Sequence, residues 1–353
     1  MQKLITGVYY THRECKNNNF LKEEPLAAAK SRLFKGDNMP GFLTHYIAGQ
    51  NLIQSVASPV TEIIKSGEKL FNLGSQGPDI FFYYFPGQLR KRSRGVGSHM
   101  HESDLGVFLA YMARLAKEAP AQDKDIIFAY TSGFIMHYAL DSHAHPYVYA
   151  MTHNEGAPKI KNSADHRKFE TAIDVAMLEL MGGKKPAELK QWELINAEAC
   201  HMCTAAAALS LGVYQVYNRD VPPKVVHRAM RHTVHFTRLI QSKTGRRKRW
   251  MELVENMTIR QPLFSSMIHM QALTEGFDYL NTRKAPWIAP WPKAESQTDS
   301  FVDRYNAAVR EAVLLVTGLH DYVYGDLPAE DLVKKLGNRS LKTGMPCEMN
   351  LAS

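Results

Sequence analysis

The chain has 353 residues and a formal net charge of +8, with 43 Lys and Arg, 35 Asp and Glu, 15 His and 4 Cys. A composition of 45% hydrophobic and 22% charged residues excludes a disordered chain, and four cysteines over this length exclude a scaffold held by disulfides. The longest apolar run, around residues 205–213, is much shorter than the roughly 20 residues that cross a bilayer, so we expect a soluble protein.

The first 38 residues differ from the rest of the chain. They contain a polar stretch of three asparagines at 17–19 and show no sustained helical period. Their apolar piece at 4–10 is too short and too interrupted for a secretory signal. We therefore expect a cytoplasmic protein in which residues 1–38 are an extension with little structure and Met39 is the native start.

From residue 39 onward, hydrophobic residues recur at the three- and four-residue spacing of amphipathic helices. Glycine and proline turns separate segments of helix length, and alternating strand patterns of any length are missing. The sequence therefore predicts a single all-α domain over 39–326, followed by a loose tail over 327–353. The segments with the clearest helical pattern are 45–67, 104–119, 123–138, 189–217, 224–242, 250–256 and 300–324.

Histidine is concentrated in one part of the domain, where seven of the fifteen lie between His99 and His166. On a helix, His137 and Asp141 project from the same face four residues apart, which suits two ligands of one divalent cation. His166 and Glu170 repeat that spacing. A hydrogen-bonded core histidine explains either pair alone about as well, but two such pairs are much less expected by chance.

Further histidines and carboxylates accompany these pairs. In chain order, the candidate ligands are His45, Asp79 in a Gly-Pro-Asp turn, His101, His137, Asp141, His145 before a proline, His166 and Glu170. This string resembles the ligand string of the zinc-dependent phospholipase C family, which is all-helical and has single-strand-specific zinc nucleases among its relatives. The resemblance covers roughly residues 39–325.

The resemblance implies two or three zinc ions and hydrolysis of a phosphodiester by a metal-bound hydroxide. It implies one zinc held by Asp79, His101, His137 and Asp141, a second held by His145, His166 and Glu170, and a third held by His45 with Asp141 as a bridge. Asp79 would also be a possible catalytic base. His99 remains an alternative to His101, and His143 or His153 an alternative to His145.

Aromatic and basic residues lie between Asp79 and His101. Phe82 and Tyr83, together with Arg90 and Arg92, are candidates for contact with substrate or with an anionic membrane. The alternative is that the aromatic residues belong to the core and the arginines to a solvated loop. A second basic run at 243–249 allows the same two interpretations.

These observations favour a zinc-dependent phosphodiesterase of phospholipase C type that acts on phospholipid and makes peripheral contact with an anionic membrane. Two alternatives stay open. One is a single-strand nuclease or nucleotidase with the same metal centre, for which nucleic acid is only a substrate. The other is a non-catalytic protein in which zinc stabilises the helices and basic loops bind a membrane or a partner.

Overall fold

The computed structural model describes residues 41–84, 89–156, 159–183, 185–242, 244–258, 264–269 and 272–348. Within these ranges almost all regular structure is helical, and the predicted all-α class is confirmed. The strands β1 (Trp287–Ile288) and β2 (Ser296–Gln297) form one short antiparallel pair. The predicted extension 1–38 and Met39 lie outside the described residues.

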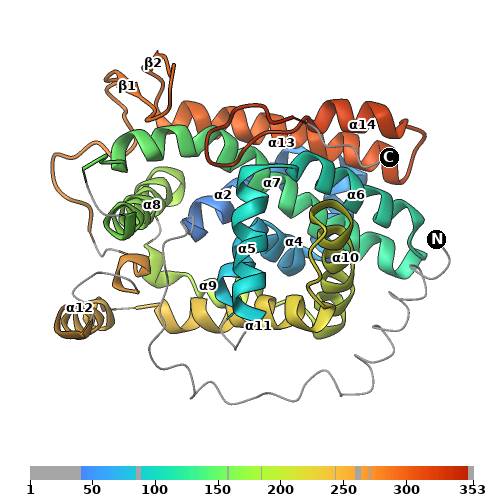
Figure 1. Cartoon of the computed structure of the whole chain (residues 1–353), viewed down its shortest axis with the longest axis horizontal. Coiled ribbons are helices and arrows are strands. Elements are labelled where there is room, and N and C mark those ends of the chain that lie inside the picture. Colours follow the sequence, from blue (N-terminus) through green and yellow to red (C-terminus); the bar gives the residue numbers. More distant parts are fainter. Residues whose placement is uncertain are drawn as a thin grey trace.

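The long helix α7 (Ala121–Thr152) is the central element of the fold and is buried along most of its length. It packs against α4 (Glu68–Gly74), α6 (Leu105–Glu118) and α13 (Phe301–Val323), which approach it from different sides (Figure 1). The sequence pattern predicts an end at residue 138, but the helix continues to residue 152. The apolar period stops there because buried histidines and a carboxylate replace apolar residues on the inner face.

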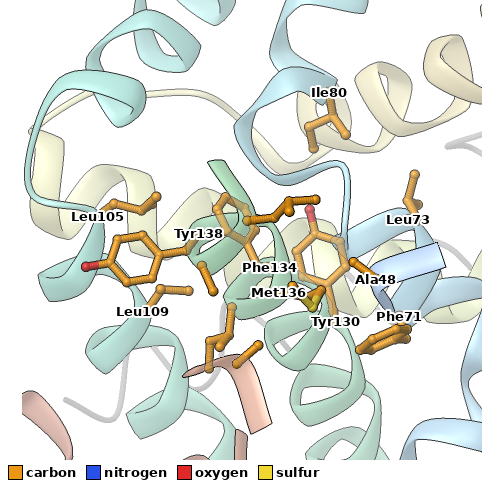
Figure 2. Packing of buried hydrophobic residues seen from close by; sticks show 14 of the residues in the cluster. Ala48, Phe71, Leu73, Ile80, Leu105, Leu109, Tyr130, Phe134, Met136 and Tyr138 are labelled. Atoms are coloured by element: carbon orange, nitrogen blue, oxygen red, sulfur yellow. The ribbon is translucent and has the colours of Figure 1, made fainter. Parts of the chain in front are cut away.

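Apolar side chains from α4 and α6 enclose the first half of α7. Figure 2 shows Tyr138 next to Leu105 and Leu109 of α6, and Tyr130 next to Phe71 of α4. All five side chains are fully buried, as expected for a helix that is enclosed by the core and has no face in contact with solvent here.

Two glycines let α4 and α7 cross at backbone contact. A Cβ atom at Gly133 would lie 2.0 Å from the Phe71 carbonyl oxygen, and one at Gly74 would lie 2.3 Å from the Tyr130 carbonyl oxygen. Because a side chain at either position would separate the helices, these glycines bring the turn after α4 close to His137, one helical turn beyond Gly133.

The other elements complete the domain. Figure 1 shows α12 at one edge of the molecule, away from the central helices. The predicted segment 45–67 is two helices, and 189–217 is likewise divided. The elements are α2 (Phe42–Ser55), α3 (Ser58–Ser66), the 3-10 helix η2 (Gly77–Tyr83), α5 (Leu89–Glu102), α8 (Lys159–Gly182), η3 (Pro186–Glu188), α9 (Gln191–Ile195), α10 (Ala199–Tyr217), α11 (Pro223–Ile240), α12 (Arg246–Thr258), η4 (Ser265–Met267) and α14 (Ala329–Leu336).

Residues 327–348 differ from the loose tail expected from the sequence. Helix α14 packs on α6 and α13 through Leu332 and Leu336, and the Tyr138 hydroxyl donates a hydrogen bond to the Leu336 carbonyl at 3.1 Å. The chain then returns across α5 and α7, where Leu341 is fully buried. Many of the contacts of residues 338–348 are made by backbone groups. Such contacts do not depend on the side chain, so they produce no apolar periodicity in the sequence.

Helix α10 is long and apolar enough to cross a membrane by length and composition alone. However, 61% of its most apolar window is buried, and the helix packs against α6, α7 and α11. The core helix of a folded domain passes the same test, so this helix is weak evidence for a membrane span.

Candidate metal centre

The eight candidate ligands lie together in the interior, around the second half of α7. His137, Asp141 and His145 follow one another at four-residue intervals on one face of that helix. The remaining candidates come from four other elements: His45 from α2, Asp79 from η2, His101 from α5, and His166 and Glu170 from α8. All eight side chains are buried, so the structure brings every predicted ligand to one place.

The first group consists of Asp79, His101 and His137, whose ligand atoms all lie within 4.8 Å of one another. His101 Nε2 is 3.1 Å from Asp79 Oδ1. The two histidines donate from Nδ1 to backbone carbonyls, His101 to Gly97 at 2.7 Å and His137 to Ser75 at 3.1 Å. Because a carbonyl only accepts, these bonds leave Nε2 of each ring as the unprotonated nitrogen that faces the group.

Gly77 is required for this geometry. Its backbone φ is +51°, which disfavours residues with a side chain, and a Cβ atom there would lie 2.2 Å from Cδ2 of the His137 ring. The Gly-Pro-Asp turn therefore packs its backbone directly on one candidate ligand while it supplies another, Asp79.

The second group consists of His145, His166 and Glu170. Glu170 Oε1 is 2.9 Å from His166 Nε2 and 3.4 Å from His145 Nε2. His145 donates from Nδ1 to the Leu341 carbonyl at 2.8 Å, which again directs Nε2 toward the group.

The third group consists of His45, His137 and Asp141. Asp141 Oδ1 is 3.2 Å from His45 Nε2, and its Oδ2 is 3.0 Å from His137 Nε2. The two imidazole rings stack with their centroids 4.6 Å apart. Asp141 Oδ2 also lies 3.8 Å from His145 Nδ1, the nitrogen that donates to the Leu341 carbonyl, so this carboxylate is close to a residue of the second group as well.

Asp174 holds the start of α2 and thereby positions His45. Its carboxylate accepts hydrogen bonds from the Leu43 and Thr44 backbone amides at 3.0 and 2.7 Å, and from His269 Nε2 at 2.7 Å. A negative charge at a helix N-terminus is favourable because it meets unpaired amides and the positive end of the helix dipole. The sequence analysis missed this residue, although it continues the four-residue spacing of His166 and Glu170.

Leu341 connects two of the groups through its backbone. Its amide donates to the His101 carbonyl at 2.9 Å, and its carbonyl accepts from His145 Nδ1 at 2.8 Å. We call residues 338–348 the C-terminal strap. The strap approaches α7 closely at Gly344, where φ is +67° and a Cβ atom would lie 2.3 Å from the Ser142 carbonyl oxygen. No side-chain signal identified the strap, because it acts through peptide groups.

Burial and neighbouring charges shift the pKa values of several residues of the centre. Burial raises the pKa of Asp79 well above its ordinary value, and it lowers the pKa of His101 to about 4. Burial also opposes the charged forms of Asp141 and His145. For Asp141 the attraction of His137 and then of His145 outweighs burial, and for His145 the attraction of Asp141 does. The pKa of Asp141 is well below its usual value, and the pKa of His145 rises to about 9 with help from Glu170.

Unsatisfied polar atoms test whether a metal fits these residues. Within the part of the chain that the structure describes, the buried atoms without a hydrogen-bond partner include Asp79 Oδ1, His101 Nε2, His137 Nε2, Asp141 Oδ2, His145 Nε2 and Glu170 Oε2. Each such atom costs about 1–3 kcal/mol when it is buried unpaired. His101 Nε2 faces Asp79 Oδ1 at 3.1 Å and His137 Nε2 faces Asp141 Oδ2 at 3.0 Å, and a metal ion held between the two atoms of each pair would satisfy both. Histidine and carboxylate are the donors that catalytic zinc uses, so the residues fit zinc.

The alternative histidines lie outside the three groups. His99 packs edge-on against the Tyr217 ring at 5.1 Å, and His143 Nε2 is 2.6 Å from Glu311 Oε2. His153 is exposed. The geometry thus favours the two histidines that the sequence analysis preferred.

The aromatic contact residues proposed from the sequence are largely buried. Phe82 is 3% and Tyr83 9% exposed, and both join Phe236 and Met267 in a small second apolar cluster. The expectation that they contact a membrane is therefore corrected, because their rings fill the space between η2 and α11. Phe82 does lie near the centre, with its ring 5.5 Å from that of His101. The side chains of Arg90 and Arg92 lie outside the described residues.

A small pocket that is partly open to solvent borders the centre. One wall carries four of the candidate ligands, His45, Asp141, His145 and Glu170. The other wall is apolar and comes from α7, α8 and the start of α13, with Leu140, Ala144, Val148, Ile173 and Phe301. A molecule bound here would have a polar group at the ligands and an apolar part beside them.

Comparison with known proteins adds the family. The family model described as zinc dependent phospholipase C matches residues 41–219, half of the chain, and this stretch contains all eight candidate ligands. Comparisons with curated proteins and with solved structures find no match. The chain belongs to the zinc-dependent phospholipase C family.

Proposed function

We propose that this protein hydrolyses the phosphodiester bond of phospholipids at a centre of two or three zinc ions. The observation that carries the proposal is the set of eight buried candidate ligands, six of which turn nitrogen or oxygen atoms without hydrogen-bond partners into the centre. Membership of the zinc-dependent phospholipase C family supports a hydrolase of the zinc phospholipase type.

The three groups of residues offer positions for two or three metals. His137 belongs to the first and third groups, but its Nδ1 donates to the Ser75 carbonyl, so its Nε2 would bind one metal only. Asp141 would bridge neighbouring positions through its two oxygens. Zinc, when bound, lowers the pKa of a coordinated water and polarises a phosphoryl oxygen. Asp79, a member of the first group, would be the base that accepts a proton from water, as the resemblance to the family implies. The backbone carbonyls of Ser75, Gly97 and Leu341 keep three histidine rings in the orientation that the reaction needs.

The pocket supports phospholipid as the substrate class. Its polar wall would receive the phosphate, and the apolar wall with Ala144, Val148 and Phe301 would contact the glycerol and the first part of the acyl chains. This apolar wall would also exclude water from the side of the substrate opposite the ligands.

The experiment measures hydrolysis by the purified zinc-loaded protein. Phosphatidylcholine dispersed in detergent micelles and single-stranded DNA are incubated separately, and the release of phosphocholine, diacylglycerol or nucleotides is followed. We expect cleavage of the phospholipid only. The variants Asp79→Asn and Glu170→Gln should lose nearly all activity, whereas the control His143→Gln, which changes a histidine paired with Glu311 outside the centre, should keep it.

The other results separate the alternatives. Cleavage of DNA without cleavage of lipid would replace the proposal with a nuclease. A protein that binds zinc and cleaves neither substrate would be a metal-stabilised binding protein.

A further inference from the structure

Helix α12 presents an apolar stripe to solvent. Trp250, Leu253 and Met257 are 62%, 58% and 76% exposed. Their spacing of three and four residues places them on one face of the helix. A helix on the surface of a globular protein normally turns such a face toward the core, so the orientation of α12 is inverted.

Hydrogen bonds and polar groups hold the opposite face of α12 to the protein. Glu255 is buried and accepts from the backbone amides of Phe264 and Ser265 and from the Ser265 hydroxyl. Lys248 Nζ donates to the Ile268 carbonyl at 2.8 Å. These contacts fix the helix with its stripe outward, so the exposure of the stripe does not come from a loosely attached helix.

The first turn of α12 is strongly basic, with Arg246, Arg247, Lys248 and Arg249 in succession. Arg247 is used structurally, because it donates to the Gln241 carbonyl at 2.8 Å. Arg246 and Arg249 are exposed and precede Trp250 and Leu253 by one helical turn. Cations at a helix N-terminus oppose the helix dipole, so this placement does not serve the stability of the helix. These two cations, which lie next to the apolar stripe, would instead complement an anionic surface that the stripe contacts.

Residues 264–268, which hold α12 through hydrogen bonds, also contact residues next to the metal centre. Ser266, in η4, accepts a hydrogen bond from Arg167 Nε at 3.0 Å, and Arg167 directly follows the candidate ligand His166. Met267 packs in the small apolar cluster with Phe82, close to His101. The helix is therefore connected to both sides of the centre by a few residues, although it lies at the edge of the molecule in Figure 1.

We propose that α12 is an interfacial helix that binds the surface of an anionic phospholipid bilayer. Trp250, Leu253 and Met257 enter the boundary between head groups and acyl chains, and Arg246 and Arg249 contact lipid phosphates. The purpose of this contact, bringing the centre to lipid, rests on the proposed function. The contact itself depends only on the stripe and its charges.

Sedimentation with vesicles tests the proposal. Full-length protein is mixed with vesicles of phosphatidylcholine alone or of equal parts phosphatidylcholine and phosphatidylglycerol, at low and high salt. We expect binding to the anionic vesicles that weakens with salt. Leu253→Glu and, as a second variant, Met257→Glu should each reduce the partition coefficient by about tenfold or more.

The matched control is Leu314→Glu, which changes a leucine that is 68% exposed on α13, along the upper edge in Figure 1 and away from α12. It should bind vesicles as the wild type does. Circular dichroism checks that all variants keep their helix content. Trp250 should also shift its fluorescence to the blue with anionic vesicles, and this shift should be lost in Trp250→Phe.

Several results would overturn the inference. They are wild-type protein that does not sediment with anionic vesicles, α12 variants that bind like the wild type, and an equal loss in Leu314→Glu. A wild-type dimer that Leu253→Glu converts to a monomer would show that a second copy covers the stripe. Because sedimentation reports binding and not the products of hydrolysis, a protein that hydrolyses phospholipid but binds no vesicles refutes this inference alone. One that binds vesicles and hydrolyses nothing refutes only the proposed function.

Discussion

Asp141 faces histidines from two helices with its two oxygens. Oδ1 lies 3.2 Å from His45 Nε2 and Oδ2 lies 3.0 Å from His137 Nε2. A carboxylate in this position has two oxygens that could each ligate a metal ion, whereas an imidazole whose Nδ1 is bonded to a carbonyl has one nitrogen for that purpose. The residue was identifiable in the sequence because it stands one helical turn after His137.

At the same scale, Gly77 gives a test that leaves all ligands in place. In Gly77→Ala the new Cβ atom would overlap the His137 ring, and the left-handed backbone adds about 1–2 kcal/mol. We expect reduced zinc content by elemental analysis and a lower free energy of unfolding in urea. Gly183→Ala is the control, because Gly183 has a similar φ of +63° but open space around it. Equal zinc content in the two variants would contradict the predicted contact.

The candidate ligands were predictable from the sequence, but the residues that orient them were not. Histidine and carboxylate at four-residue spacing are a side-chain signal, and His166 with Glu170 shows it clearly. Leu341 acts through its peptide group, which every residue type possesses, so its role depends on the tertiary fold. Asp174 was accessible in principle, but its partners are backbone amides 130 residues earlier in the chain.

At the scale of the element, the helices were predicted where one face is apolar and missed where the interior is polar. The segments that became α6 and α13 have the expected period and end within a few residues of the predicted limits. The second half of α7 lost that period, because the centre takes the place of apolar core. The sequence of the strap shows no hydrophobic periodicity, because its contacts are largely hydrogen bonds of peptide groups, which do not depend on residue type.

The N-terminus of α13 carries a capping box that can be tested by pH. Ser300 Oγ accepts from the Asp303 amide, and the Asp303 carboxylate accepts from the Ser300 amide at 2.9 Å. The bonds that the Ser300 amide and hydroxyl donate to this carboxylate lower the pKa of Asp303 to about 2. Its stabilising effect is therefore complete above the ordinary pKa of about 4 and decreases as the pH falls toward 2.

We expect Ser300→Ala to lower the free energy of unfolding by about 1 kcal/mol at pH 7, measured in urea. Asp303→Asn should also destabilise the protein at pH 7, and its difference from the wild type should shrink as the pH falls from 4.5 to 3. A difference that grows over this interval would show that Asp303 does not titrate as the capping box requires.

The strap should set the affinity for zinc. Truncation after Gly337 removes the amide that binds the His101 carbonyl and the carbonyl that binds His145. Loss of such outer hydrogen bonds weakens metal binding by about 10- to 100-fold, and competition with a chelator measures this change. Lys342→Ala is the control. It removes the ion pair between Lys342 of the strap and Glu102 of α5, and it keeps the backbone of the strap. A truncated protein with unchanged zinc affinity would contradict this role.

At the scale of the whole molecule, the metal centre takes the place of part of a hydrophobic core. Helices α2, α5, α7 and α8 and the 3-10 helix η2 each place at least one ligand in it. Treatment with a chelator should therefore lower the melting temperature of the entire domain rather than loosen one element. With zinc at a thousandfold excess over its dissociation constant, the expected stabilisation is about 4 kcal/mol, and added zinc should restore it. A melting temperature that a chelator leaves unchanged would count against the centre.

The overall class and the family were predictable, and the cytoplasmic location stays a prediction. The match to the family model stops at residue 219, whereas the strap and α12 lie beyond it. The inverted orientation of α12 was not predictable, because an amphipathic pattern shows that a helix has two faces but does not show which one is turned outward.

The strap also has a consequence for biosynthesis. Residue 341 completes a centre whose first ligand is His45, so nearly 300 residues must be made between the two. While the ribosome is still translating that interval, His101 and His145 can be presented to metal without the peptide group that fixes their rings. Loading with zinc in the final geometry is therefore a late event, and chains stalled before residue 341 should be found without it.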